Sequence, residues 1–161
     1  MNVTIYSRKD IEKLLSLGKI ENAAVISFHD PVARGRRYLE NYAPIDFSGK
    51  CESVMQIAVH DLDPEALADF GLTLDTYFPE ADALAEFICK AKADGLNIIC
   101  QCEYGQSRSA GCAAAILQHF ESRGIDIFAN YKYYPNQLIY NKLFDALERT
   151  KMLSDTSKQN K

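Results

Sequence analysis

The sequence has 161 residues, which is enough for one domain with a single hydrophobic core. Hydrophobic residues make up 47% of it and charged residues 25%, as in an ordinary globular protein. The formal net charge of -4 argues against a nucleic-acid or membrane-surface binder, because either would need a basic surface, so we expect neither kind of partner.

Strand and helix patterns alternate along the chain. Four short apolar runs have the character of buried strands, and they cover residues 3–6, 23–28, 53–59 and 96–100. Four further segments have the apolar spacing or the end signals of helices, and they cover residues 8–17, 79–94, 109–120 and 136–149. Because strands that alternate with helices form parallel sheets, the sequence predicts an α/β fold with a central, mainly parallel sheet flanked by helices.

Individual residues mark the ends of these helices. Ser7 and Asp10 have the spacing of a capping pair for the first helix, and Gly18 ends it. Pro79 opens the second helix, and Asn136 is read as the N-cap of the last one.

Two segments carry no strand or helix pattern. Residues 32–49 are expected to be a loop on which Arg34, Arg36 and Arg37 are solvated. Residues 154–161 are polar, and we expect them to be a disordered tail behind a single domain of residues 1–153.

The most informative segment is the loop between the fourth strand and the third helix. In it, Cys102 is followed by five residues and then by Arg108. The intervening residues, which with Arg108 would form a phosphate-binding loop, are Glu103, Tyr104, Gly105, Gln106 and Ser107. In a loop that leads into a helix N-terminus, successive backbone N–H groups point inward and bind an anion. Gly105 permits the tight backbone that such a loop requires.

Cys102 and Arg108 are suited to one reaction in this setting. The arginine guanidinium offers two parallel N–H groups to two phosphoryl oxygens, which a lysine cannot match. The same positive field stabilises the thiolate of Cys102, which is the nucleophilic form of the side chain. The pattern therefore predicts a cysteine-dependent phosphatase.

The sequence also resembles a known family, the dual-specificity branch of the protein tyrosine phosphatase superfamily. The resemblance is carried by the run Cys102-Glu103-Tyr104-Gly105-Gln106-Ser107-Arg108-Ser109. It extends upstream to Asp61 and downstream to Pro135-Asn136, over roughly half of the chain, and it is similar in particular to a compact bacterial and phage group of predicted tyrosine phosphatases. The resemblance implies the cysteine-phosphatase fold and the hydrolysis of a phosphorylated protein or a small phosphomonoester, with phosphotyrosine favoured.

The resemblance also implies a role for each residue of the loop. Cys102 would attack phosphorus and form a cysteinyl-phosphate, while Arg108 and the loop amides hold the phosphoryl oxygens. The Ser109 hydroxyl would help the thiolate to leave when water hydrolyses the intermediate. No metal or other cofactor is expected, because the loop supplies the positive charge. The family usually has His before the nucleophile, and since Gln101 adds no positive charge there, we expect a slower enzyme.

A carboxylic acid should protonate the leaving group, and the resemblance places it on the loop after a strand. Asp61 follows the third strand directly and is our candidate for the general acid. Asp63 is the reserve candidate, although Pro64 after it makes a helix N-cap the simpler reading.

Two other classes of function stay open. One is a catalytically weak phosphate-binding module of the same fold, and the other is a different thiol enzyme, such as a rhodanese-like sulfurtransferase or an arsenate reductase. Ser109 and the upstream acid favour the phosphatase. The loop interior lacks lysine, which argues against highly charged inositol phosphates as substrates.

The remaining cysteines are predicted to be structural. The sequence has 5 cysteines, an odd number, and its first residues lack the basic start and long apolar stretch of a secretory signal. We therefore expect reduced thiols in a cytoplasmic protein, with Cys89, Cys100 and Cys112 as small core residues.

Overall fold

The computed structural model describes residues 1–32, 43–51 and 53–159, and for residues 154–159 it describes the backbone alone. The arginines of the expected loop, Arg34, Arg36 and Arg37, lie outside the described residues. Of the segment predicted as a disordered tail, residues 160–161 also lie outside the described residues, and the backbone of residues 154–159 belongs to a helix.

The described strands form a single parallel sheet. They are β1 (Val3–Tyr6), β2 (Ala23–His29), β3 (Ser53–Ala58) and β4 (Asn97–Gln101). The sheet has 4 strands in the order β1-β4-β2-β3, and β2 pairs with both β3 and β4 in parallel register. The predicted α/β fold with a mainly parallel sheet is confirmed, and the predicted strand ends are right to within one residue.

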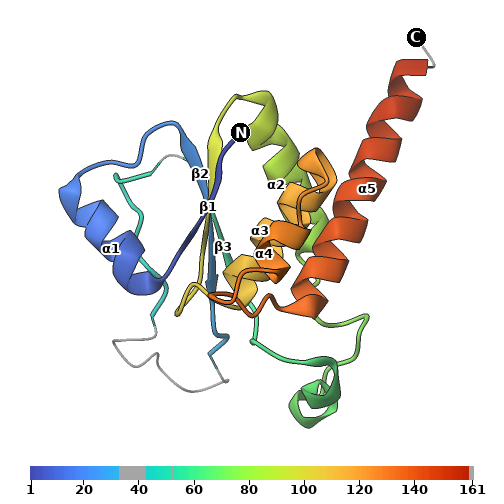
Figure 1. The fold of residues 1–161 in the computed structure, drawn as a ribbon, viewed down its shortest axis with the longest axis horizontal. Coiled ribbons are helices and arrows are strands. Elements are labelled where there is room, and N and C mark those ends of the chain that lie inside the picture. The colour runs from blue at the N-terminus through green and yellow to red at the C-terminus, as the bar shows by residue number, and fades with distance from the viewer. Residues whose placement is uncertain (33–42, 52, 160–161) are drawn as a thin grey trace.

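Helices cover both faces of the sheet. They are α1 (Arg8–Leu17), α2 (Ala81–Ala93), α3 (Arg108–Glu121), α4 (Ile125–Phe128) and α5 (Gln137–Gln159). In Figure 1, α1 lies on one face and the other four helices lie on the opposite face. The sequence patterns indicated a helix start at Pro64, where the 3-10 turn Pro64–Ala66 begins, but not the short helix α4 or the second 3-10 turn, Ala68–Phe70.

The helix ends follow the predicted residues at some positions and not at others. The Ser7 Oγ accepts a hydrogen bond from the Asp10 amide at 3.2 Å, so the predicted capping pair is confirmed. The Asn136 Oδ1 accepts one from the Ile139 amide at 2.9 Å and caps α5 as predicted. The end of α5 was predicted wrongly, since the helix runs on to Gln159 through a stretch without glycine or proline that could stop it.

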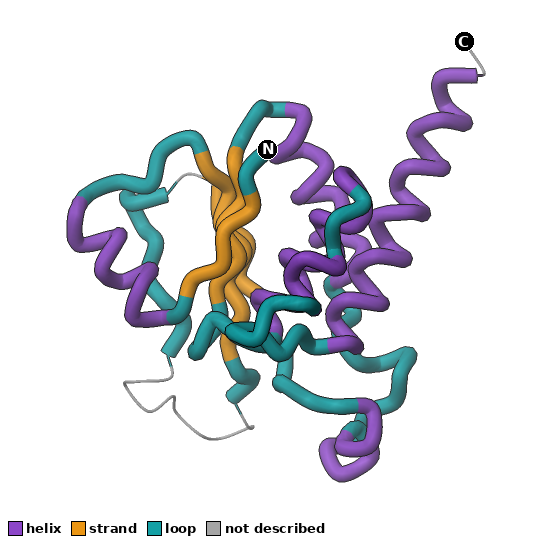
Figure 2. The backbone as a smooth tube through the Cα atoms, in the orientation of Figure 1, coloured by secondary structure: helices purple, strands orange, loops and turns teal. Residues whose placement is uncertain are grey.

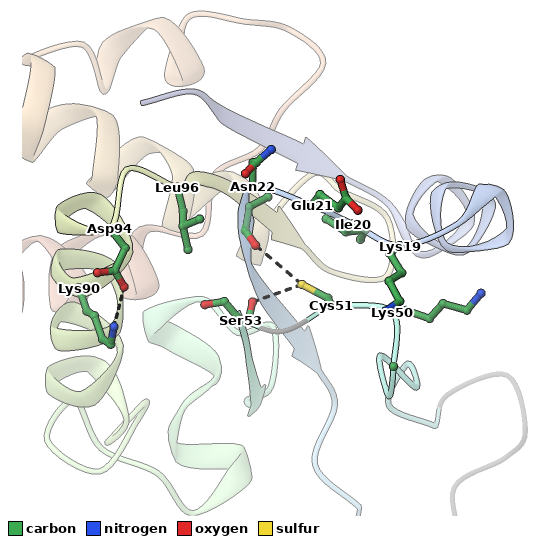
Figure 3. Close-up of a pocket in the computed structure, with 12 residues that line it drawn as sticks. Lys19, Ile20, Glu21, Asn22, Lys50, Cys51, Ser53, Lys90, Asp94 and Leu96 are labelled. Carbon is green, nitrogen blue, oxygen red and sulfur yellow. Dashed lines mark hydrogen bonds and ion pairs between the residues drawn. The ribbon is translucent and has the colours of Figure 1, made fainter.

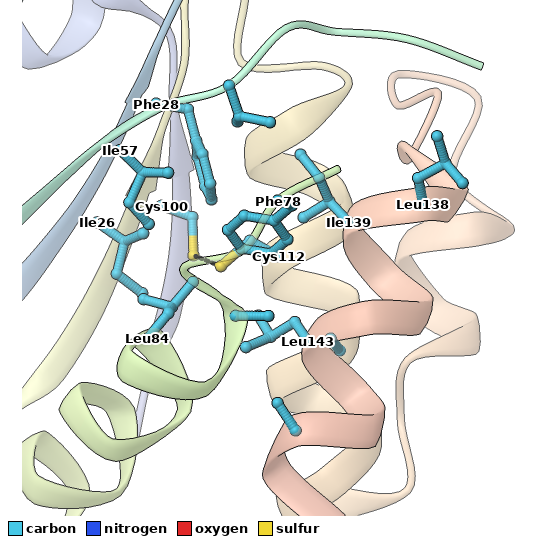
Figure 4. Packing of buried hydrophobic residues seen from close by; sticks show 14 of the residues in the cluster. Ile26, Phe28, Ile57, Phe78, Leu84, Cys100, Cys112, Leu138, Ile139 and Leu143 are labelled. Atoms are coloured by element: carbon cyan, nitrogen blue, oxygen red, sulfur yellow. Dashed lines mark hydrogen bonds between the residues drawn. The ribbon is translucent and has the colours of Figure 1, made fainter. Parts of the chain in front are cut away.

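A hydrophobic core lies on each face of the sheet. On the α1 side, Ile11 and Leu15 pack with Val25 and Ile99 of the sheet and with residues 45 and 47. On the other side, Figure 4 shows side chains of β2 and β3 facing α2, α3 and α5. The fully buried members of this larger core include Ile26, Ile57, Leu84, Ile139 and Leu143.

Two of the cysteines belong to the larger core. Cys100 on β4 and Cys112 on α3 are fully buried, and their Sγ atoms lie 3.7 Å apart (Figure 4). Burial, and the neighbouring Cys100, raise the pKa of the Cys112 thiol, which therefore stays neutral and unreactive. The prediction that these two cysteines are core residues is confirmed.

No helix among the described residues is long and apolar enough to span a membrane.

We expect Leu84→Ala to lower the free energy of unfolding by about 2–5 kcal/mol, because the substitution leaves a cavity in place of the fully buried Leu84 side chain of α2. Urea denaturation measures this change. Leu74→Ala is the control, since Leu74 is 61% exposed and its truncation should cost less than about 0.5 kcal/mol. Equal losses in the two variants would contradict the described core.

Candidate active site

The candidate site lies at the edge of the sheet where the strands end. In a parallel sheet all carboxyl ends meet at one edge, and ligands bind in the crevice outside them. The loop of residues 102–107 follows β4, which lies between β1 and β2 in the sheet. Figure 2 shows loops gathered at this end of the strands, which is the lower end of the sheet in that view. The sheet order thus surrounds the cysteine loop with the residues that follow β1 and β2.

The cysteine loop is held by hydrogen bonds to its outward-facing carbonyl groups. The Arg8 amide donates to the Glu103 carbonyl at 3.1 Å, and the Tyr134 amide donates to the Gln106 carbonyl at 2.9 Å. The Ser107 carbonyl accepts from the amides of Gly111 and Asn136, at 2.8 and 3.1 Å. With its carbonyl groups engaged from outside, the loop is arranged so that its N–H groups can line the concave side.

Two glycines allow this loop to pack closely against its neighbours. Gly105 has φ +66°, and a Cβ atom there would lie 2.7 Å from the Ser7 amide nitrogen at the end of β1. At Gly111 on α3, a Cβ atom would lie 2.5 Å from the Asn136 carbonyl oxygen. The absence of a side chain at both positions lets the loop sit directly on β1 and on the start of α5.

Gln101, where the family usually has His, is buried and fully engaged. Its Oε1 accepts a hydrogen bond from the Ser27 hydroxyl at 2.6 Å, and its Nε2 donates to the Cys102 carbonyl at 2.8 Å. The glutamine therefore turns the Cys102 carbonyl outward without contributing charge.

Cys102 and Ser109 face each other at the base of the loop. Cys102 is 2% exposed and Ser109 is fully buried, and the Cys102 Sγ lies 3.0 Å from the Ser109 Oγ. A serine hydroxyl at this distance can donate to a thiolate, which otherwise would be a buried and costly charge.

Arg108, the first residue of α3, is buried with one edge of its guanidinium engaged. Its Nη1 donates to the Asp30 Oδ1 at 2.7 Å and to the Val59 carbonyl at 2.8 Å. Its Nε is buried and has no hydrogen-bond acceptor among the described residues. A buried N–H group without an acceptor is rare, and here it belongs to the arginine that the sequence predicts to bind a phosphoryl group.

Asp61 reaches the loop from the segment after β3. Its Oδ1 accepts hydrogen bonds from the Ser107 hydroxyl at 2.6 Å and from the Asn136 Nδ2 at 2.9 Å. Its Oδ2 lies 3.9 Å from the Arg108 Nε. The structure thus brings Asp61 to Ser107 of the cysteine loop and to Arg108 at its end.

The segment that carries Asp61 is anchored on both sides. The Tyr77 hydroxyl donates to the His60 carbonyl at 2.8 Å, and the Asn136 Nδ2 donates to the Leu62 carbonyl at 3.0 Å. Burial and the nearby carboxylate of Asp61 raise the pKa of Tyr77, so its hydroxyl stays a donor. Asp63 is exposed and is the N-cap residue of the first 3-10 turn, as predicted, although its side chain makes no capping hydrogen bond.

The other residues of the loop lie at its rim. Glu103 forms an ion pair with Arg8, with 2.8 Å between the Glu103 Oε2 and the Arg8 Nε. Tyr104 is 75% exposed, and Gln106 is exposed beside it. Tyr134, whose amide bonds the loop, is 73% exposed and so does not pack into the core. Two exposed aromatic residues therefore lie in the loop and beside it, Tyr104 and Tyr134.

Sequence reasoning missed three contributors to this site. Ser27 and Asp30 were not singled out, and Asn136 was read only as a helix cap, whereas its amide also holds Asp61. A signal for Asp30 was present, because it follows a predicted strand at the edge where the cysteine loop also had to lie.

Larger hollows on the protein lie away from this chemistry. A cavity of about 730 Å³ opens at the other edge of the sheet, where β2 and β3 begin, and Lys19, Lys50 and Lys90 line it together with Cys51 (Figure 3). Its lining residues do not combine a cysteine with an arginine as the cysteine loop does. The cysteine loop, for its part, needs only the volume of one phosphoryl group. Among the residues that the structure describes, no three His, Cys, Asp or Glu side chains are grouped so as to hold a metal ion.

The fold is that of the dual-specificity phosphatases of the protein tyrosine phosphatase superfamily, as the resemblance implied. No family model matches the sequence, and no curated protein matches it significantly. The likeness is therefore carried by the tertiary structure.

Three solved structures illustrate this likeness. DUSP15 superimposes with a TM-score of 0.57 at 17% identity, over 96% of this chain and 91% of that chain. PTPMT1 in complex with PI(5)P gives 0.53 at 14% identity, over 95% and 94%. The human tyrosine phosphatase-like serine/threonine/tyrosine-interacting protein gives 0.53 at 15% identity, over 86% and 83%. At these identities the comparison defines the fold.

We expect Gly105→Ala to destabilise the protein by more than the ~1–2 kcal/mol of a left-handed backbone alone, because the added Cβ also collides with β1. Anion binding by the loop should weaken in parallel. Thermal denaturation with and without vanadate measures both effects. Gly71→Ala is the matched control, since Gly71 has φ +67° with no atom within 4 Å of the added Cβ. If both variants lost the same stability, close packing of the loop on β1 would be disproved.

Proposed function

We propose that this protein is a cysteine-dependent phosphatase that hydrolyses phosphomonoesters through a cysteinyl-phosphate at Cys102. One observation carries the proposal: the buried Arg108 Nε has no acceptor and belongs to the same loop as the Cys102 thiol. A phosphoryl oxygen between the two side chains would satisfy that N–H group and present phosphorus to the sulfur.

The first half of the reaction transfers the phosphoryl group to sulfur. The Cys102 thiolate attacks phosphorus, the bond from phosphorus to the leaving oxygen breaks, and that oxygen takes a proton from Asp61. Asp61 Oδ1 is already held by two donors, so Oδ2 is the oxygen that would carry the proton. Arg108 and the loop amides stabilise the charge on the phosphoryl oxygens.

The second half returns the enzyme to its starting state. Water attacks phosphorus and gives its proton to the Asp61 carboxylate, and the bond between phosphorus and sulfur breaks. The Ser109 hydroxyl, 3.0 Å from the Cys102 Sγ, donates a hydrogen bond to the departing thiolate and so lowers the barrier.

The rim of the loop supports phosphotyrosine as the preferred substrate. The exposed rings of Tyr104, in the loop, and Tyr134, beside it, suit contact with an aryl group. The loop interior contains no lysine, which disfavours a ligand with several phosphates. The phosphoinositide bound to PTPMT1 is therefore not the substrate that we propose for this chain.

Cys102→Ser should abolish hydrolysis of an aryl phosphate, because a serine hydroxyl in this loop has no general base to activate it. The wild type should be inhibited by vanadate, and both properties are read from a chromogenic assay. Cys89→Ser, which changes a half-buried cysteine on α2, should retain activity. Hydrolysis that survived in the Cys102 variant would exclude Cys102 as the nucleophile.

A catalytically weak phosphate-binding module is the alternative with a specific observation in its favour, the neutral Gln101 in place of His. Rapid mixing with an aryl phosphate distinguishes the two. A phosphatase releases phenol continuously after any burst, whereas a module that is trapped as cysteinyl-phosphate stops after one equivalent.

Asp61→Asn should slow hydrolysis by about 10²–10⁴-fold for substrates with poor leaving groups, because the general acid is lost. Activated aryl esters should suffer less, and the acidic group should disappear from the pH profile of kcat. Steady-state kinetics on a leaving-group series measures this dependence. If Asp63→Asn gave this pattern instead, Asp63 would be the acid and our assignment would be wrong.

A further inference from the structure

Asp30 lies where it can control the orientation of Arg108. It follows β2 directly, and β2 is the neighbour of β4, from which the cysteine loop departs. The end of β2 is tied to the segment after β3, because the Val59 amide donates to the His29 carbonyl at 3.0 Å. The Asp30 carboxylate and the Val59 carbonyl are thereby presented together to α3.

Both of these acceptors bind the same nitrogen of Arg108. Nη1 donates to the Asp30 Oδ1 at 2.7 Å and to the Val59 carbonyl at 2.8 Å. The N–H of Nε and one N–H of Nη2 run parallel along the opposite edge of a guanidinium, where they can bind two oxygens of one phosphoryl group. Fixing Nη1 therefore fixes the direction in which the bidentate edge points.

Asp30 also affects the distance between Arg108 and Asp61. The Asp61 Oδ2 lies 3.9 Å from Nε, which is an ion pair without a hydrogen bond. A guanidinium released from Asp30 could rotate and donate Nε to this oxygen, and Asp61 would then occupy the edge of Arg108 that is proposed to bind the phosphoryl group. The ion pair between Asp30 and Arg108 counteracts that rotation.

We propose that Asp30 is a positioning residue that holds Nη1 of Arg108, so that the bidentate edge of the guanidinium faces the phosphoryl group instead of closing on Asp61. This inference rests on the proposed function, because it assigns Arg108 to the phosphoryl oxygens. Asp30 itself is not placed in contact with the substrate.

The test compares Asp30→Ala and Asp30→Asn with the wild type. Each protein is assayed for kcat and KM on an aryl phosphate, for vanadate affinity by calorimetry and for thermal stability. Asp82→Ala is the matched control, since it also removes a carboxylate from an Arg–Asp pair, with 2.6 Å between the Arg149 Nη2 and the Asp82 Oδ1. That pair joins α2 to α5, away from the cysteine loop.

Misorientation of the Arg108 guanidinium should lower kcat/KM of Asp30→Ala by roughly tenfold to a hundredfold and weaken vanadate binding similarly. Most of the loss should fall on kcat, and the melting temperature should fall below that of Asp82→Ala, because the buried Arg108 loses a partner whereas Arg149 is exposed. Asp30→Asn should recover most of the loss, because its amide oxygen still accepts from Nη1. Asp82→Ala should keep the wild-type kinetics.

Two results would overturn the inference while leaving the proposed function intact. One is an active wild type together with an Asp30→Ala variant whose kcat and vanadate affinity are unchanged or improved. The other is a kinetic loss that the asparagine variant does not reduce, which would show that an acceptor for Nη1 at this position does not orient Arg108. If the wild type itself neither hydrolysed the ester nor bound vanadate, the proposed function and this inference would fail together.

Discussion

A buried guanidinium organises the carboxyl edge of the sheet. Arg108 is 4% exposed, and an unpaired charge at such a position would be costly. The fold meets this cost in part with the Asp30 carboxylate and the Val59 carbonyl on Nη1, and it brings Asp61 to 3.9 Å from Nε. These contacts tie together the ends of β2 and β3 and the start of α3. The Nε edge has no acceptor among the described residues, and the anion binding that we propose for the site depends on this edge.

The cysteine loop is shaped by its surroundings more than by its own side chains. Its carbonyl groups are engaged by the amides of Arg8, Tyr134 and Asn136 and by the side chain of Gln101. Gln101 replaces an imidazole with an amide that makes two buried hydrogen bonds and brings no charge. The orientation of the loop is therefore retained, while the positive field on the Cys102 thiol rests on Arg108 and the backbone dipoles.

Asn136 connects the two halves of the site. Its Oδ1 caps α5, and its Nδ2 donates to both the Asp61 carboxylate and the Leu62 carbonyl. Its backbone amide donates to the Ser107 carbonyl. The segment that carries Asp61 and the cysteine loop are therefore both held in place by the start of α5. A change in the position of α5 would move both of them together, which couples the packing of the larger core to the geometry of the site.

The sequence by itself determined the strands, the parallel α/β class and the loop from Cys102 to Arg108, because these depend on local apolar patterns and on spacing within one short segment. It also indicated the caps at Ser7 and Asn136, which depend on neighbouring residues. It misplaced the end of α5, because no stop residue marks it. Only the tertiary structure decided that Asp61 rather than Asp63 contacts the loop, and that Asp30 and Ser27 support Arg108 and Gln101. Those contacts join residues that are distant in the chain, and the strand order that brings them together is set by packing on both faces of the sheet, which no local pattern encodes.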